Sequence, residues 1–236
     1  MVKRLLRKFI DKEDPYPTVR LVESNGYASV FQVSNGVEDF RVSQFGNEKE
    51  QLNRFIDAVD SESVVWDVGA NVGLYSIFAA RAGKTVHAYE PEPSFADHLR
   101  RNAELNGQEV HIHELALSDE DGERTLYTDG IDGMSPSLAG KERGTVQINA
   151  RRGDGLSDLQ TPDILKIDVE GAEVDVLHGL ENRLDDISTV FIEIHPEMID
   201  DFDSKVGDAK NIMQAKGFEL VWEVERDKQI HTIYQK

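Results

Sequence analysis

The stretch Val64–Pro91, VVWDVGANVGLYSIFAARAGKTVHAYEP, decides the fold of this chain. An apolar run leads into Asp67 and predicts a buried strand, and a second short strand ends at Glu90. Between them lies a turn in which Gly69 lets the backbone reverse sharply, while Gly73 permits close packing of the following helix on the strand. This order is typical of the first β-α-β unit of a nucleoside-binding sheet.

Strands and helices continue to alternate after this unit, which predicts right-handed crossovers and a parallel sheet. The expected strands are 63–67, 85–90, 109–114, 163–168 and 189–194, and the expected helices are 72–82, 93–106, 173–184 and 203–216. Extra strands at 123–128 and 145–150 flank a loop rich in Gly, Ser and Asp, and a short helix is expected near 154–159. Two closing strands, 218–224 and 229–235, would pair as a hairpin. We therefore expect an α/β fold with a doubly wound, mainly parallel, seven-stranded sheet.

A small antiparallel extension is expected before the main domain. Alternating residues predict strands at 18–24, 27–34 and 37–43, and Asn25-Gly26 and Asn35-Gly36 are typical of tight hairpin turns. A helix at 46–59 follows. These patterns divide the chain into an extension, 1–45, and a main domain, 46–236.

Residues 1–12, MVKRLLRKFIDK, hold five of the 26 basic residues. On a helix, their apolar side chains would lie opposite the basic ones. We favour a cap helix that complements an acidic body, and the alternative is weak contact with an anionic membrane surface. We expect neither a membrane span nor a secretory leader, and hence a cytoplasmic protein, at the inner membrane face if the alternative holds.

The composition narrows the classes of function. With 45 acidic and 26 basic residues, the net charge of -19 argues against a nucleic-acid partner bound through a broad basic face. Such an excess of acid suggests a halophilic source, where salt screens the repulsion, and an acidic mesophilic protein is the alternative. The absence of cysteine excludes disulfides, cysteine-ligated zinc and a thiol nucleophile.

The turn DVGANVG at 67–73 discriminates between two nucleoside ligands. A dinucleotide needs G-x-G-x-x-G for its pyrophosphate, but here Asn71 replaces the second glycine. The start of the helix offers amides to a carboxylate, and Asp67 suits an ammonium group, which together describe the methionine end of S-adenosylmethionine. Glu90 is placed to accept hydrogen bonds from both ribose hydroxyls. This turn resembles that of class I methyltransferases, and a nicotinamide-dependent oxidoreductase is the alternative.

Two later strands carry charged side chains at their carboxyl ends. Lys166 and Asp168 alternate along LKIDVEGAE, and Glu193 and His195 alternate along FIEIHPE, so that each pair points to one side. Ligands of open α/β sheets bind at this edge, and charges within apolar strands are costly unless they are satisfied. These four residues are our candidate catalytic residues.

Together, DVGANVG, AYEPEP, LKIDVEGAE and FIEIHPE resemble the FkbM family of S-adenosylmethionine-dependent methyltransferases, in the family's order, from about Phe45 to His195. The resemblance implies O-methylation of a hydroxyl on a sugar or a natural product, with S-adenosyl-L-methionine as cofactor. The expected cofactor contacts are Asp67, Gly69, Ala70, Asn71, Gly73, Glu90, Pro91 and Asp168, with Ala116 and Leu117 beside the adenine.

The expected chemistry aligns an acceptor oxygen with the methyl group and removes its proton. His195 is our general base, because its ordinary pKa lies near neutrality. The alternatives are a histidine bonded to a loop carbonyl and, for a sugar carboxylate, a histidine that only orients the acceptor. Lys166 is expected to pair with Asp168 or Glu170.

We predict no metal, although Asp168, Glu193 and His195 are a donor set that suits magnesium or manganese. A small-molecule or glycan acceptor is expected, lipid-linked if residues 1–12 touch a membrane. Methylation of a non-sugar molecule and a cofactor-binding module without activity are the remaining alternatives.

Overall fold

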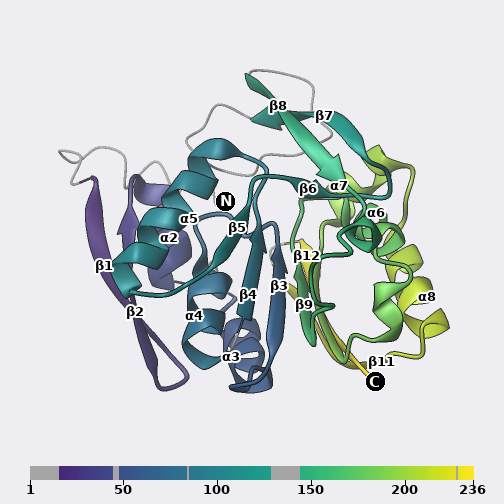
Figure 1. The fold of residues 1–236 in the computed structure, drawn as a ribbon, viewed down its shortest axis with the longest axis horizontal. Helices are drawn as coiled ribbons and strands as arrows, with labels where there is room; N and C mark the ends of the chain where they lie inside the picture. The colour runs from purple at the N-terminus through teal and green to yellow at the C-terminus, as the bar shows by residue number, and fades with distance from the viewer. Residues whose placement is uncertain (1–15, 45–47, 84, 129–143, 227) are drawn as a thin grey trace.

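Seven strands form the main sheet, in the order β11-β12-β10-β9-β3-β4-β5 (Figure 1). The computed structural model describes residues 16–44, 48–83, 85–128, 144–226 and 228–236. The strands are β3 Val64–Val68, β4 Thr85–Tyr89, β5 His111–His113, β9 Ile164–Ile167, β10 Thr189–Ile194, β11 Glu219–Arg226 and β12 Gln229–Gln235. The first five run parallel, and β12 runs antiparallel to both of its neighbours. The predicted seven-stranded, mainly parallel sheet is confirmed.

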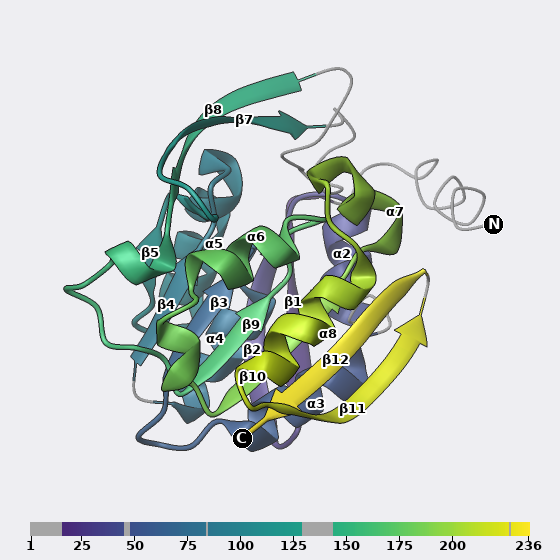
Figure 2. The ribbon, with the colours of Figure 1, turned by 90° about the vertical axis from the view of Figure 1, so that its right-hand side faces the viewer.

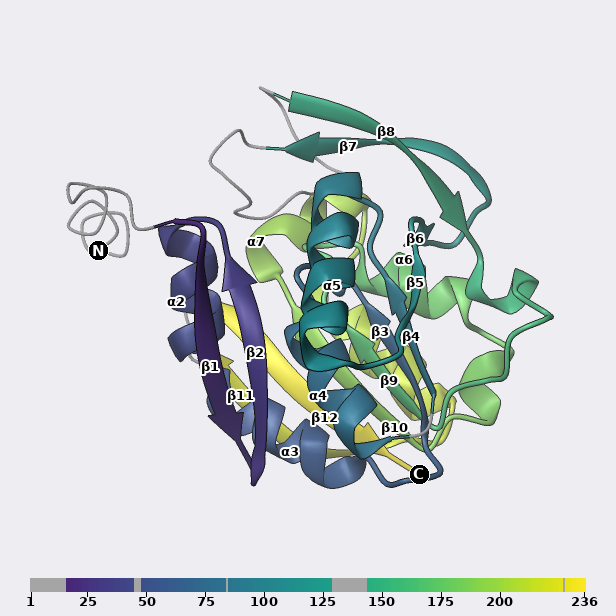
Figure 3. The ribbon, with the colours of Figure 1, turned by 60° about the vertical axis from the view of Figure 1, so that its left-hand side comes forward.

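Helices cover both faces of this sheet, because successive strand side chains point to opposite sides. Val65 and Phe191 pack with α3 (Lys49–Ala58), α4 (Leu74–Ala82) and α5 (Pro93–Asn106). Trp66 and Ile192 point the other way and pack with α6 (Glu173–Gly179) and α8 (Val206–Ala215). Figure 2 shows α6 and α8 in front of the sheet, and Figure 3 shows α4 and α5 on the opposite side.

Several predicted helices are shorter than expected. The helix expected at 173–184 ends at Gly179, and a 3-10 turn at Arg183–Asp185 follows it. The helix expected near 154–159 is a 3-10 turn at Gly153–Gly155. Short helical turns α7 (Pro196–Ile199) and η4 (Asp200–Phe202) come directly after β10, before α8.

The N-terminal extension is a hairpin of β1 (Thr18–Ser24) and β2 (Tyr27–Val33) beside α5 (Figure 3). Its turn is Asn25-Gly26, and both residues have positive φ, 47° and 81°, as the sequence predicts for a two-residue turn. Residues 1–12, with the predicted cap helix and its membrane alternative, lie outside the described residues.

Residues 37–43 were predicted to be a third strand, and this is wrong, because they belong to helix α2 (Gly36–Gln44). The Asn35 side chain accepts the Glu38 backbone N–H at 2.9 Å, and Glu38 Oε2 accepts the backbone N–H of Ser34 at 2.6 Å. This reciprocal arrangement resembles a capping box, so Asn35-Gly36 begins a helix and not a hairpin turn.

A second, smaller sheet lies beyond the carboxyl edge of the main sheet (Figure 1). It consists of β6 (Ala116–Leu117), β8 (Gly144–Arg151) and β7 (Gly122–Thr128), in that order. The two longer strands are those predicted at 123–128 and 145–150, and most of the loop between them lies outside the described residues. No helix in the described part of the chain is long and apolar enough to cross a membrane.

Candidate active site

The glycine-rich turn joins β3 to α4 at the carboxyl edge of the main sheet. The backbone N–H groups of Gly69 and Ala70 both donate to the carbonyl oxygen of Tyr89, at 2.9 and 3.1 Å. Gly69 has a φ of 83°, and a Cβ added to it would lie 1.8 Å from the carbonyl oxygen of Asp168. Only glycine fits here, and the turn therefore touches the loop that carries a predicted catalytic residue.

Two further residues shape the start of α4. Gly73, with a φ of 91°, is the N-cap, and a Cβ there would lie 2.8 Å from Cγ of Leu99 in α5. Its small size therefore permits close packing between two helices, and not between helix and strand as predicted. Asn71 has a φ of 50°, and its side-chain oxygen accepts the N–H of Val72 at 2.8 Å. The side chain of Asn71 is thus bonded to the start of the helix itself.

Glu90, a predicted cofactor contact, lies beside the glycine-rich turn. Its two carboxylate oxygens accept the backbone N–H groups of Asn71, at 2.8 Å, and of Glu92, at 2.9 Å. Burial raises the pKa of Glu90 from 4.5 to about 7, although these two hydrogen bonds act in the opposite direction. Each oxygen has a second lone pair, so the carboxylate can still accept hydroxyl donors.

The other predicted cofactor contacts lie deeper. Asp67 is 1% exposed, and its carboxylate faces α4, where Ser76 donates to it at 2.6 Å. The side chains of Ala116 and Leu117 are buried in two different apolar clusters, and their backbone belongs to strand β6, which pairs with β8. Pro91 is partly buried between Glu90 and the start of α5.

Lys166 and Asp168 lie next to the turn and form the predicted pair. The Lys166 ammonium donates to Asp168 Oδ2 at 3.1 Å and lies 4.3 Å from the ring centre of Tyr75. Burial lowers the pKa of Lys166, but the charges of Asp168 and Glu193 outweigh burial and hold it above its usual value. A charged, paired ammonium is a poor nucleophile, so Lys166 holds the shape of the site.

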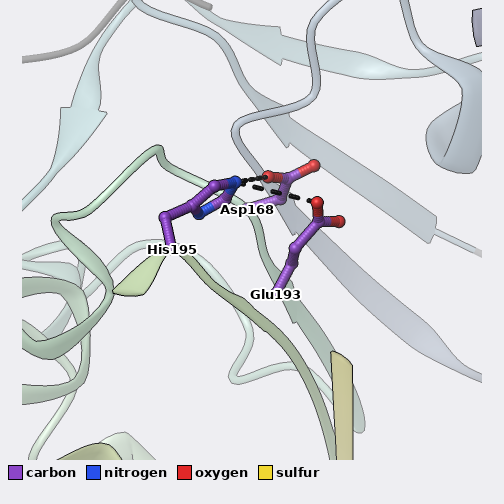
Figure 4. A group of neighbouring side chains, drawn as sticks. All are labelled: Asp168, Glu193 and His195. Carbon is purple, nitrogen blue, oxygen red and sulfur yellow. Dashed lines mark ion pairs between the residues drawn. The ribbon is translucent and has the colours of Figure 1, made fainter. Parts of the chain in front are cut away.

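His195 follows β10, and both of its ring nitrogens face carboxylates. Nδ1 lies 2.7 Å from Glu173 Oε1. Nε2 lies 3.3 Å from Glu170 Oε2, 3.7 Å from Glu193 Oε1 and 3.8 Å from Asp168 Oδ1. Figure 4 shows Asp168 and Glu193 facing the ring. Among the described residues, Nε2 has no hydrogen-bond partner.

These carboxylates change the titration of His195. Burial lowers its pKa, but the hydrogen bond that His195 donates to Glu173 and the charges of Glu170 and Asp168 outweigh burial and raise the pKa to about 9. A pKa this far above the ordinary value favours the protonated imidazole at neutral pH. The predicted reason for a general base, an ordinary pKa near neutrality, does not hold, and the role of His195 stays a proposal.

Glu193 connects the cluster to helix α3. It is 2% exposed, and its Oε2 lies 3.5 Å from His231 Nδ1, which in turn lies 3.0 Å from Gln51 Oε1. The hydroxyl of Tyr75 lies 3.1 Å from the same Gln51 oxygen. Burial, with the nearby charge of Asp168, raises the pKa of Glu193 well above its usual value.

Sequence reasoning missed three residues of this cluster. Glu173 lies in the motif LKIDVEGAE and was readable as a further acid beside Asp168. The sequence does not single out His231, because only the register of β12 against β10 places it opposite Glu193. Gln51 lies on helix α3, which precedes the main sheet in the chain. Nothing in the sequence of this helix indicates that Gln51 contacts His231.

The sequence of the chain is similar to those of known methyltransferases. The FkbM methyltransferase domain matches residues 67–220. The chain is 29% identical over 178 residues to the hexuronic acid methyltransferase AglP of Haloferax volcanii, and the match covers 74% of each protein. It is 30% identical over 247 residues to the 31-O-demethyl-FK506 methyltransferase FkbM of Streptomyces tacrolimicus, covering 89% of this chain and 92% of that protein.

Solved structures share the architecture. A ribosomal protein L11 methylase from Lactobacillus delbrueckii subsp. bulgaricus has a TM-score of 0.52 and 15% identity, with 80% of this chain and 79% of that chain covered. The precorrin-6y C5,15-methyltransferase of Geobacter metallireducens has a TM-score of 0.50 and 16% identity, with 80% and 88% covered. At these identities the likeness shows the fold alone, which is the Rossmann-like fold of class I methyltransferases.

Proposed function

The chain belongs to the FkbM family of methyltransferases, and we propose that it transfers a methyl group from S-adenosylmethionine to an oxygen atom of a sugar or glycan. The cofactor, the oxygen acceptor and the class of acceptor are parts of this proposal. A nicotinamide cofactor is disfavoured by Asn71 in place of the second glycine and by the family.

The contact between Gly69 and Asp168 carries the proposal. The turn and Glu90 have the features that S-adenosylmethionine requires, namely a carboxylate for the ribose and a backbone that no side chain obstructs. Asp168 belongs to the cluster with Glu193 and His195, at the same edge of the sheet. A cofactor held by the turn would therefore lie beside this cluster, which is where an acceptor must bind.

The proposed reaction asks the protein for alignment and for removal of a proton. S-adenosylmethionine supplies a methyl group that its positive sulfur already makes electrophilic. The acceptor oxygen forms the new C–O bond as the C–S bond breaks, the electron pair of the C–S bond stays on sulfur, and a hydroxyl acceptor loses its proton. In this proposal Asp168, Glu193 and His195 align that hydroxyl, and Lys166 fixes Asp168. The neutral form of His195, which its raised pKa confines to alkaline pH, receives the proton.

The relatives guide the choice of acceptor. AglP is named for a hexuronic acid, and FkbM is named for an oxygen of FK506, so both names support an oxygen acceptor. A hexuronic acid offers a carboxylate, which needs no base, as well as hydroxyls. The net charge of -19 argues against a nucleic-acid acceptor.

Calorimetry and a methyl-transfer assay test this proposal. We expect S-adenosylmethionine to bind and NADH not to bind, and we expect S-adenosylhomocysteine to accumulate with hexuronic acids as acceptors. The Glu90→Ala variant should lose cofactor affinity, whereas Glu109→Gln, which removes an exposed charge beyond α5, should not. Binding of NADH, or no binding of S-adenosylmethionine, would overturn the proposal.

The His195→Ala variant separates two modes of acceptor activation. Loss of a catalytic acid or base typically costs about 10²- to 10⁴-fold in rate, so we expect a loss of that size in kcat for a hydroxyl acceptor. A loss below about tenfold with unchanged cofactor affinity would mean that His195 only orients the acceptor, as for a sugar carboxylate.

A further inference from the structure

We infer that Asp168, Glu193 and His195 form a binding site for a divalent cation of the manganese type, an ion that accepts both oxygen and imidazole ligands. The site stands on the geometry of this cluster alone. Its role, to hold the acceptor oxygen, rests on the proposed function.

The orientation of His195 is the first argument. Its Nδ1 lies 2.7 Å from Glu173 Oε1, and that same oxygen accepts the backbone N–H of Gly171 at 2.9 Å. A carboxylate that fixes one ring nitrogen while the other nitrogen points into a site is the usual support of a metal-binding histidine. A neutral ring that donates from Nδ1 to Glu173 points the lone pair of Nε2 at carboxylate oxygens, which is repulsive unless a proton or a cation lies between them.

The distances within the cluster are the second argument. Nε2 lies 3.7 Å from Glu193 Oε1 and 3.8 Å from Asp168 Oδ1, and one donor atom from each of the three residues lies within 4.8 Å of the others. Donor atoms bound at about 2.1 Å to one ion lie roughly 3.0 Å apart when adjacent and 4.2 Å apart when opposite. The two distances from Nε2 are too long for direct hydrogen bonds and lie within this range.

The third argument is that the two oxygens of each carboxylate face different groups. Asp168 directs Oδ2 to the Lys166 ammonium and Oδ1 to the ring of His195. Glu193 directs Oε2 toward His231, 3.5 Å away, and Oε1 to the ring. Each carboxylate thus sends one oxygen to the same point, while a second group lies beside its other oxygen.

Burial makes this arrangement costly without a cation. Glu193 and His195 are 2% and 4% exposed, and among the described residues His195 Nε2, which faces the cluster, has no hydrogen-bond partner. Oxygens of Asp168, Glu170 and Glu193 lie at similar distances from Nε2. A proton on Nε2 can form a hydrogen bond with only one of them at a time. A divalent cation satisfies them together, because one ion binds several oxygens.

The remaining coordination positions indicate the role of the ion. Asp168 is 25% exposed at its side chain and Glu170 is 15% exposed, so the cluster opens on the side of these residues. A cation of this type takes about six ligands, of which the cluster supplies three or four. We expect the others to be acceptor oxygens, which fits a sugar with neighbouring hydroxyls or with a carboxylate beside a hydroxyl.

Titration of the full chain with Mn²⁺, followed by electron paramagnetic resonance of the free ion, tests the site. We expect one saturable site, competition by Mg²⁺, and at least about tenfold weaker binding in Glu193→Gln and Asp168→Asn, which keep side-chain shape. The matched control is Asp201→Asn, an exposed acid of η4, which should bind Mn²⁺ as the wild type does. Thermal unfolding, measured on every variant, shows whether each is folded.

Two results would overturn the cation site: no saturable Mn²⁺ binding by the wild-type chain, or binding that is unchanged in both Glu193→Gln and Asp168→Asn. If Mn²⁺ binds as expected but S-adenosylmethionine does not, the proposed function fails and the cation site stands. If S-adenosylmethionine binds and Mn²⁺ does not, the cation site fails and the proposed function stands.

Discussion

The carboxylate of Glu90 accepts two backbone N–H groups and is only 5% exposed, and its pKa is raised to about 7. A protonated carboxyl group loses an acceptor that two ribose hydroxyls would need. We therefore expect the ionised form to be the one that binds the proposed cofactor, and a pKa of about 7 gives comparable amounts of both forms at neutral pH.

Cofactor affinity should consequently rise with pH. About one tenth of Glu90 is ionised at pH 6 and about nine tenths at pH 8, so the Kd for S-adenosylhomocysteine should be about tenfold higher at pH 6. Calorimetry over this range, in buffers of different ionisation enthalpy, should also show proton release on binding below pH 7. The Glu90→Gln variant should bind more weakly with this pH dependence removed, and a wild-type affinity that is independent of pH would contradict the prediction.

Gly69 is the residue at which backbone conformation and packing coincide. Its φ of 83° and the position of a Cβ 1.8 Å from the Asp168 carbonyl oxygen mean that alanine must displace either the turn or the loop. We expect Gly69→Ala to lower the free energy of unfolding by about 3 kcal/mol or more and to abolish cofactor binding. Gly107→Ala is the matched control, because Gly107 has a φ of 60° with open space around it and should cost only about 1 kcal/mol. If urea denaturation showed the same loss of unfolding free energy in Gly69→Ala and Gly107→Ala, the close approach to Asp168 would not contribute to stability.

At the scale of elements, local patterns predicted the sheet well and the extension less well. Val64–Val68 and Thr189–Ile194 are apolar runs between turn residues, so their position and direction follow from the sequence. Residues 37–43 alternate like a strand, but Asn35 and Glu38 cap a helix there, and the N-x-x-E spacing was the signal to weigh. The contact between Glu193 and His231 depends on strand register and could not be predicted.

Helix α5 supports the hairpin through two asparagines that the sequence does not single out. The Asn102 side chain accepts the N–H of Gln32 at 2.8 Å and donates to the carbonyl oxygen of Val72 at 2.9 Å. One turn later, Asn106 accepts the N–H of Val30 at 2.8 Å. These amides therefore satisfy the backbone of β2 on the side that no strand covers.

Removing Asn102 should destabilise the whole protein. Asn102 is fully buried, and Asn102→Ala would leave the N–H of Gln32 and the carbonyl oxygen of Val72 without their hydrogen-bond partner. We expect a loss of about 3 kcal/mol in the free energy of unfolding. Helix propensity alone predicts the opposite sign, because alanine is the better helix former. Glu104→Ala, at an exposed position of the same helix, should therefore change stability by less than about 0.5 kcal/mol. A stabilised Asn102→Ala variant in urea denaturation would contradict the role of these hydrogen bonds.

At the scale of the molecule, the site combines residues that are remote in sequence. Glu193 and His231 come from neighbouring strands of the sheet, Gln51 comes from the helix before it, and Gly69 touches the loop of Asp168. The hairpin and α2 share one apolar cluster with α3 and α4, through Val22, Phe31 and Val42 among others. The extension predicted at 1–45 is thus, in its described part, packed onto the same core as the cofactor side of the sheet.

The net charge of -19 leads to a prediction for the whole molecule, because repulsion among 45 acidic residues opposes the compact state. The screening length falls from about 10 Å at 0.1 M salt to about 3 Å at 1 M, so added salt removes most of this repulsion. If screening recovers about 2 to 3 kcal/mol, the Tm should rise by roughly 5 to 10 °C between 0.1 and 1 M KCl. Thermal unfolding with EDTA present excludes a contribution from the proposed cation site.

Sucrose and acid separate charge screening from general stabilisation by cosolutes. Sucrose of equal osmolality should raise the Tm by less than KCl does, because it is excluded from the surface without screening charge. At pH 5 some acidic groups with raised pKa values, such as Glu90, hold protons, so the KCl effect should be smaller than at pH 8. A Tm that rises equally with sucrose and KCl, or falls with KCl, would show that the acidic surface is not what limits stability. A salt-dependent Tm would in turn support the halophilic origin that the composition suggests.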